Sequence, residues 1–96
     1  MPSFVSLLNF TDQGIRNVKE SPDRYEAVKA AAETVGVKIR DIMWTVGAYD
    51  LVVVIDGPEE AVTSLLLKLG SLGNVRTQTL RAYSQQEMRG LIAKMP

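Results

Sequence analysis

The sequence predicts an α+β fold in the order strand, helix, strand, strand, helix, strand, followed by a C-terminal helix. Residues 4–10 are rich in β-forming residues, and residues 51–55 are five apolar residues in succession, as is typical of strands. Residues 21–35 and 57–70 instead space their apolar residues at the helical period. This order of elements is the ferredoxin-like βαββαβ pattern.

The first half of the chain begins with a strand at Phe4–Phe10 that ends at a polar pair. Thr11 or Asp12 is expected to cap a short first helix. Ser21 is expected to cap a second helix, with Pro22 at its first position. The apolar stripe of this second helix is expected to be Tyr25, Val28, Ala32 and Val35.

The middle of the chain reads as two strands joined by a turn. The strands are predicted at 37–46 and at 51–56, where both faces of the second strand are apolar. The connection is Gly47-Ala48-Tyr49-Asp50. We expect Gly47 to adopt a positive φ and Asp50 to accept hydrogen bonds from backbone N–H groups.

The last third of the chain is predicted to hold a helix, a strand and a terminal helix. Pro58 suits the first position of the helix, and Gly70 suits its end. A strand follows at 75–83, and Ser84 with Glu87 then forms a capping box. The apolar residues of the first of these helices are Ala61, Leu65, Leu66 and Leu69, and those of the last are Met88, Leu91, Ile92 and Met95.

Length and composition limit the function. A chain of 96 residues suits a single domain spanning 1–96. Lys plus Arg and Asp plus Glu are 11 each, which argues against a nucleic-acid surface. The chain has no cysteine and no histidine, so we expect no metal site and no cofactor, and the commonest general base is missing. The N-terminus does not read as a signal peptide, and no apolar run suits a membrane span, so a cytoplasmic protein is expected.

The sheet is predicted to carry more apolar surface than two helices can cover. Leu51–Ile55 does not alternate with polar residues, and Phe4–Phe10 is apolar on both parities. The uncovered face would be an exposed apolar patch, which monomers rarely tolerate. A second copy packed sheet to sheet would cover it, giving a dimeric α+β barrel, with a larger homo-oligomer as an extension. The alternative is that the strand at 51–55 is merely central.

Three stretches of the chain resemble the GYD domain family. They are MPSFVSLLNFTDQGIRNVKESPDR, WTVGAYDLVVVIDGP and GSLGNVRTQTLRAYS, in which Ala48 separates Gly47 from Tyr49-Asp50. The resemblance implies a dimeric α+β barrel and no assigned activity. The chain also resembles, more weakly, the effector-binding domain of leucine-responsive, AsnC-type regulators, and this resemblance rests on Gly47, Tyr49 and Asp50. That likeness implies small-molecule binding at subunit contacts.

The candidate ligand-binding residues fall into two sets. Tyr49 and Asp50 are placed at a turn, where the alternative is a purely structural role. Asn9, Trp44 and Arg81 lie in predicted strands, and they are the residue types with which cofactor-independent monooxygenases of the same barrel group hold substrates. A core role for Trp44 and an intrachain ion pair for Arg81 are the alternatives. Residues 70–76 follow a helix and precede a strand, the reverse of a phosphate-binding loop.

The sequence leaves three functions open. The best supported is a non-catalytic small-ligand-binding or oligomerisation module of the GYD family. The alternative is a cofactor-independent monooxygenase or isomerase acting on a small aromatic or keto substrate. The third is a protein whose only role is assembly with itself.

Overall fold

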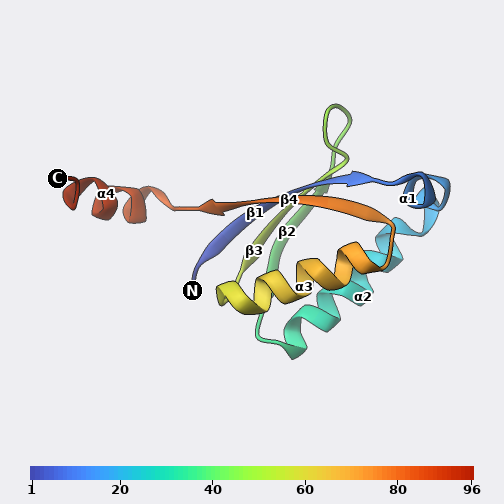
Figure 1. The fold of residues 1–96 in the computed structure, drawn as a ribbon, viewed down its shortest axis with the longest axis horizontal. Coiled ribbons are helices and arrows are strands. Elements are labelled where there is room, and N and C mark those ends of the chain that lie inside the picture. Colours follow the sequence, from blue (N-terminus) through green and yellow to red (C-terminus); the bar gives the residue numbers. More distant parts are fainter.

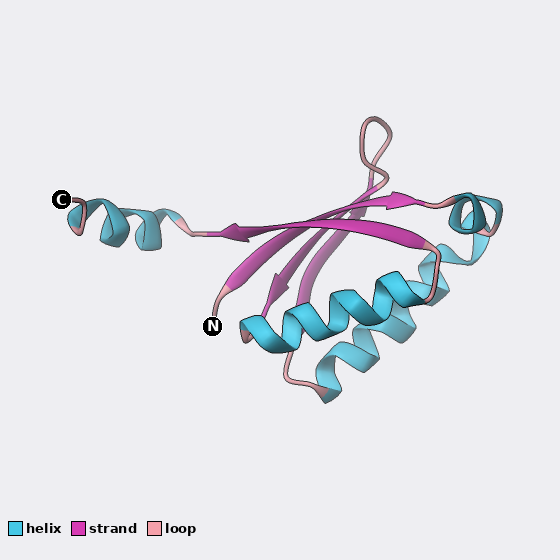
Figure 2. Cartoon of the chain, in the orientation of Figure 1, coloured by secondary structure: helices cyan, strands magenta, loops and turns pink.

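The computed structural model describes residues 1–96 as a four-stranded antiparallel sheet with two helices on one face (Figure 1; Figure 2). The strand order is β2-β3-β1-β4, so the first strand lies in the centre beside the third. The predicted α+β, ferredoxin-like arrangement is thereby confirmed. The elements are β1 (Ser3–Phe10), α1 (Asp12–Arg16), the 3-10 helix η1 (Val18–Glu20), α2 (Ser21–Thr34), β2 (Lys38–Trp44), β3 (Leu51–Asp56), α3 (Glu59–Ser71), β4 (Val75–Ala82) and α4 (Gln85–Ala93).

The hydrogen-bond register decides which side chains share a face of the sheet. In the centre, Phe4 pairs with Ile55 of β3 and with Arg81 of β4, while Leu8 pairs with Leu51 and Thr77. The β2–β3 ladder is shifted between Ile39 and Asp41 by an extra residue in β2. A bulge of this kind puts two successive residues against one partner and moves the following side chains to the opposite face.

The core lies between the sheet and the helices α2 and α3. One parity of each inner strand is buried, since side chains alternate across a strand and only this face is covered. The helices add small and branched side chains, among them Ala32 from α2 and Val62 from α3. The buried core residues are Phe4, Leu8, Ala32, Val37, Ile39, Leu51, Val53, Ile55, Val62 and Leu65.

The helix ends differ from the sequence prediction by one or two positions. Thr11 caps α1 as expected, its hydroxyl accepting from the N–H of Gly14 at 3.1 Å. Ser21 is the first residue of α2 and not its cap, and its hydroxyl accepts from Trp44. Pro58 is the N-cap of α3 and not its first residue, and the positive-φ glycine beyond that helix is Gly73 with φ 84°. The shifts at Ser21 and Pro58 are within the one or two residues by which helix boundaries vary.

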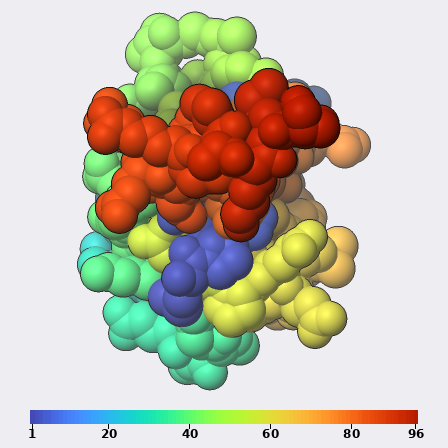
Figure 3. All heavy atoms as spheres, turned by 90° about the vertical axis from the view of Figure 1, so that its left-hand side faces the viewer, coloured from blue at the N-terminus to red at the C-terminus, as the bar shows by residue number.

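The C-terminal helix α4 stands apart from the rest of the molecule. Figure 1 shows it continuing from the end of β4, beyond the edge of the sheet. Figure 3, viewed from that end, shows it as the part of the molecule nearest the viewer, in front of the body. The predicted capping box is present, because the Ser84 hydroxyl accepts from the Glu87 N–H and the Glu87 carboxylate accepts from the Ser84 N–H. Its apolar residues Met88, Leu91, Ile92 and Met95 are all exposed.

None of the helices combines the length and the apolar character needed to cross a bilayer. The molecule measures 49 × 31 × 18 Å along its principal axes, and α4 is what makes it long (Figure 1). Its thinness follows from having a single layer of helices on a single sheet.

Candidate functional site

The face of the sheet turned away from α2 and α3 is apolar at its centre. Alternation places Val5 and Leu7 of β1 on it, opposite Val54 and Val52 of β3. All four are partly exposed, and Leu80 of β4, the partner of Val5, is 48% exposed. We call this surface the open face. No helix covers it (Figure 1), as the apolar parity of these strands predicted.

The loop at residues 45–50 is fastened to one end of the sheet. The Thr45 N–H donates to the Asp50 carbonyl at 2.8 Å, and the Thr45 hydroxyl donates to the Tyr49 carbonyl at 2.6 Å. Gly47 has φ 155°, the positive value predicted for it. Asp50 Oδ2 accepts from the backbone N–H of Phe10 at 2.8 Å, so the expected acceptor role of Asp50 is confirmed.

Tyr49 connects this loop to the open face. Its hydroxyl donates to Oε1 of Gln78 at 2.9 Å, and Gln78 lies opposite Leu7 on β4. Asn9, exposed at the same end of β1, pairs with Arg76 of β4. The two candidates Asn9 and Tyr49 therefore lie at the same end of the open face, with Asp50 behind them in the turn.

Trp44 points to the opposite, helix-covered face. Its indole Nε1 donates to the Ser21 hydroxyl at 3.0 Å, and its ring meets that of Tyr25 edge to face, with the centroids 6.1 Å apart. The bulge in β2 is the cause, because the extra residue after Ile39 reverses the side on which the following residues lie.

Arg81 lies at the far end of the sheet. Its guanidinium sits over the Tyr83 ring at 4.4 Å and the Phe4 ring at 5.5 Å. Its Nη1 donates to the backbone carbonyls of Ser3 and Ala82. The two ion pairs of the chain, Arg24–Glu20 and Arg40–Asp56, do not involve Arg81. The five predicted site residues are thus divided among three places, and their ligand-binding role remains a prediction.

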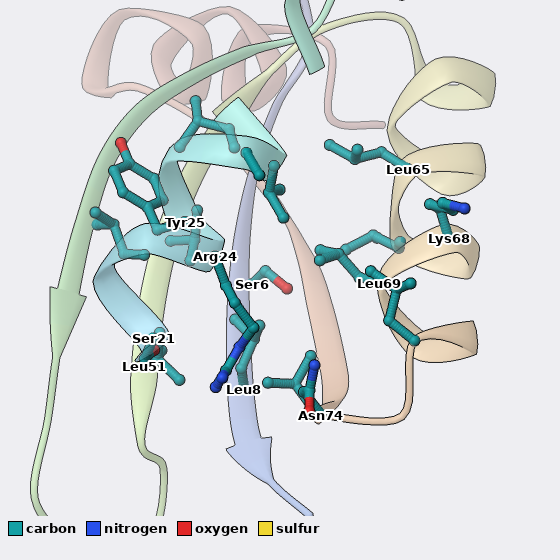
Figure 4. Close-up of a pocket in the computed structure, with 18 of the residues that line it drawn as sticks. Ser6, Leu8, Ser21, Arg24, Tyr25, Leu51, Leu65, Lys68, Leu69 and Asn74 are labelled. Carbon is teal, nitrogen blue, oxygen red and sulfur yellow. The ribbon is translucent and has the colours of Figure 1, made fainter. Parts of the chain in front are cut away.

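A cavity of about 320 Å³ lies between α2, α3 and the sheet (Figure 4). This volume is near the lower limit for small-molecule sites, about 300–1,000 Å³. The walls come from both helices, and the floor comes from all four strands, with only Val75 contributed by β4. The lining comprises Ser6, Leu8, Phe10, Ser21, Arg24, Tyr25, Ala27, Val28, Ala31, Ile39, Ile42, Leu51, Val53, Ile55, Leu65, Leu66, Lys68, Leu69, Leu72, Asn74 and Val75.

This cavity was not predicted from the sequence. Helical spacing assigned Tyr25, Val28, Leu65, Leu66 and Leu69 to the buried core. The available signal was the pair of small residues on α2, Ala27 and Ala31, which face the cavity where larger residues would fill it. Two alanines one helical turn apart do not by themselves distinguish a cavity from close helix packing.

One end of the cavity is polar. Arg24 reaches it from α2 and Asn74 from the segment before β4, and both lie at the lower end of the cavity in Figure 4. Arg24 Nη1 donates to the Asn17 carbonyl at 2.9 Å and lies 3.8 Å from the Glu20 carboxylate. Arg24 Nη2 is buried and has no hydrogen-bond partner.

The remaining polar groups show little sign of acid–base or metal chemistry. No group of three or more Asp and Glu side chains is placed to hold a metal ion. The Ser6 hydroxyl, at the floor of the cavity, is hydrogen-bonded to the Thr79 hydroxyl at 2.9 Å. The pKa of the exposed Glu87 is lowered, first by its hydrogen bond from the Ser84 backbone and then by the Ser84 side chain. Glu87, at the start of α4, is not part of the cavity lining, but it shares a shallow surface pocket with Val5 and Val54 of the open face.

The fold defines a small α+β domain of ferredoxin-like topology with one face of its sheet uncovered. The GYD domain model matches residues 4–92, and the chain belongs to this family. A relative from Thermus thermophilus is 34% identical over 84 residues, covering 85% of this chain and 88% of the relative. That protein is named "Glutamine synthetase and cystathionine beta-lyase binding protein".

Proposed function

We propose that the protein is a non-catalytic binding module that acts as a homodimer, with two copies packed through the open face. The observation that supports this most directly is the apolar centre of that face, built from Val5, Leu7, Val52, Val54 and Leu80. Two sheets packed in this way bury both apolar faces in one core about 10 Å thick. The result is the dimeric α+β barrel expected from the sequence.

A second copy of the chain is the occupant that the composition favours. Only 14 of the 96 residues are buried, so the protomer alone has a small core for its length. The formal net charge is zero, so two copies do not repel each other. A two-fold contact uses the same patch on both chains, and an apolar face with few charges at its centre is complementary to itself.

Light scattering coupled to size exclusion tests this proposal. The wild-type protein is expected to have the mass of a dimer. Val54→Lys, at the centre of the open face, is expected to raise the dissociation constant at least about a hundredfold, because burying an unpaired charge costs several kcal/mol.

The matched control is Leu67→Lys on the outer side of α3, where Leu67 is 70% exposed. It introduces the same charge and should leave the mass unchanged. A wild-type protein that stays monomeric at every concentration, or equal effects of the two lysines, would contradict the proposal.

Binding of a second protein is the other candidate function, and the name of the Thermus thermophilus relative supports it. The exposed apolar residues of α4, Met88, Leu91 and Ile92, are a second surface that could make such a contact. Flexible methionines are common on surfaces that accept more than one partner. We expect immobilised protein to retain purified glutamine synthetase or cystathionine beta-lyase.

The contact surface can be separated from the dimer by substitution. Ile92→Glu on α4 is expected to remove binding of the enzyme while the dimer mass stays unchanged. If neither enzyme binds the wild-type dimer, this second candidate function fails and the dimer proposal is unaffected. A ligand role for Asn9, Trp44, Tyr49, Asp50 and Arg81 and a cytoplasmic location stay predictions.

A further inference from the structure

We propose that the cavity between α2, α3 and the sheet binds a small apolar monocarboxylate, whose carboxylate is held by Arg24. This site does not depend on the homodimer, because the cavity lies on the opposite side of the sheet from the open face. The cavity would give the protein a small-molecule site in addition to the protein contacts proposed for the open face and α4.

The walls of the cavity fix the apolar part of the ligand. Leu65 and Leu69 of α3 line one side of it and Tyr25 of α2 belongs to the other side (Figure 4), above a floor that includes Leu8 and Leu51. The polar atoms of the floor are already bonded, since Ser6 pairs with Thr79. A ligand with several polar groups would have to leave some of them unpaired against these walls, which is costly. An aliphatic or aryl-alkyl chain fits the lining best.

Arg24 fixes the other end of the ligand. Its Nη2 is buried without a hydrogen-bond partner, and a buried cationic N–H left unpaired costs more than a neutral one. The Glu20 carboxylate does not meet this need, because it lies 3.8 Å from Nη1 and its side chain is 72% exposed, where ion pairs contribute little. An anionic oxygen placed at Nη2 would supply the missing acceptor.

The other polar groups of the lining agree with a single carboxylate. Asn74 Oδ1 accepts from the Gln13 side chain at 2.9 Å, so its NH2 group is the part available to a ligand. Lys68, the second cation of the lining, points its amine away from the cavity in Figure 4. One guanidinium edge and one amide donor match one carboxylate, and Arg presents its donors in the planar geometry that a carboxylate prefers.

Trp44 provides a spectroscopic readout of the cavity. It is the only tryptophan of the chain, and it contacts two residues of the lining, Ser21 by a hydrogen bond and Tyr25 by its ring. A ligand that enters between the helices changes the surroundings of Tyr25 and Ser21, and the indole emission reports that change. The test therefore needs no label.

The experiment compares octanoate with octanol at neutral pH, both below their aggregation limits, by Trp44 fluorescence and calorimetry. We expect saturable binding of one octanoate per protomer and roughly tenfold weaker binding of octanol, since a charge-assisted hydrogen bond is lost. Arg24→Gln should bring octanoate down to the affinity of octanol. Arg16→Gln, on the exposed surface of α1, is the matched control and should change neither.

A second pair of variants tests the cavity without removing a core side chain. Ala31→Phe fills the cavity from α2 and should weaken octanoate and octanol alike, whereas Ala30→Phe, its exposed neighbour outside the lining, should not. Thermal melts confirm that each variant is folded. The proposal is overturned if octanoate does not bind, if octanol binds equally well, or if the two phenylalanines behave the same. Repeating the titration with Val54→Lys separates this site from the dimer, since binding should persist there.

Discussion

The carboxylate of Asp50 accepts a hydrogen bond from the backbone N–H of Phe10 at 2.8 Å, while the N–H of Asp50 itself donates to the Leu8 carbonyl at 2.8 Å. The paired register of β1 and β3 ends at Leu8 and Leu51. Asp50 therefore continues the attachment of the loop to β1 where the regular ladder stops. In the Tyr49-Asp50 turn, the aspartate anchors the fold and the tyrosine faces the open surface.

Asp50→Ala is expected to lower the free energy of unfolding by about 1–3 kcal/mol, because the Phe10 N–H loses its acceptor at a partly buried position. Urea unfolding followed by circular dichroism measures this. Asp50→Asn keeps an acceptor oxygen and should lose less. If Asp50→Ala unfolds at the same urea concentration as the wild type, the anchor contributes nothing to stability.

The buried hydroxyl pair Ser6–Thr79 gives a second prediction. Ser6 is 1% exposed and lies under the helices. Ser6→Ala should destabilise by about 1–3 kcal/mol, because the Thr79 hydroxyl is left without its partner. The double variant Ser6→Ala, Thr79→Val removes both hydroxyls and should be more stable than the sum of the single effects predicts. A strictly additive double-mutant cycle would show that the two hydroxyls are not coupled.

Gly14 occupies a position where no side chain fits. A Cβ there would lie 1.9 Å from the backbone oxygen of Asn74, the atom that accepts from the Thr11 N–H at 3.0 Å. Gly14→Ala should therefore destabilise the protein by about 1–3 kcal/mol or more, through displacement of the chain before β4.

Gly70 is the matched control for Gly14. It lies within α3 and a Cβ there meets nothing within 4 Å. Gly70→Ala should stabilise by up to about 1 kcal/mol, the helix-propensity difference. Thermal unfolding of both variants, compared with the wild type, should show shifts of opposite sign, and shifts of the same sign would contradict the close contact at Asn74.

Glu87 makes the stability of α4 depend on pH at the acidic end. Its pKa is lowered by hydrogen bonds from the Ser84 backbone and side chain, so the folded helix binds the proton less well than the unfolded chain. The contribution of the capping box is thus present above the unfolded pKa and is lost as the pH falls through the folded pKa. An NMR titration should place the Glu87 pKa below its usual value. In Ser84→Ala the backbone N–H of residue 84 remains and only the side-chain contribution is lost, so the pKa should move part of the way up, and no movement would show that the Ser84 hydroxyl does not lower it.

The order of the elements could be predicted from the sequence because period and alternation are local properties. The open face was predictable for the same reason, since Leu51–Ile55 is apolar on both parities. The side on which Trp44 lies was not, because it depends on one extra residue in β2 between Ile39 and Asp41. Nothing in the spacing of apolar residues marks that bulge.

The cavity could not be predicted because it depends on how far two helices stand apart on the sheet. The stripes on α2 and α3 were recognised, but the same stripes would form a filled core if the helices packed closely. The burial of Arg24 could not be predicted from the sequence either. Its neighbours in the sequence, Asp23 and Glu26, indicate a solvated helix face, and only the tertiary structure buries its Nη2.

The joint between β4 and α4 has a consequence for how this molecule could reach others. Only Tyr83 and Ser84 separate the strand from the helix, and the Tyr83 ring is clasped by the Arg81 guanidinium at 4.4 Å. The orientation of α4 relative to the sheet therefore depends on this one stacking contact at its N-terminal end and not on packing along the helix. Replacing Tyr83 by a residue without a ring would change the orientation of α4 and leave the core intact. The geometry of an assembly that uses α4 could therefore change without a change in the stability of the protomer.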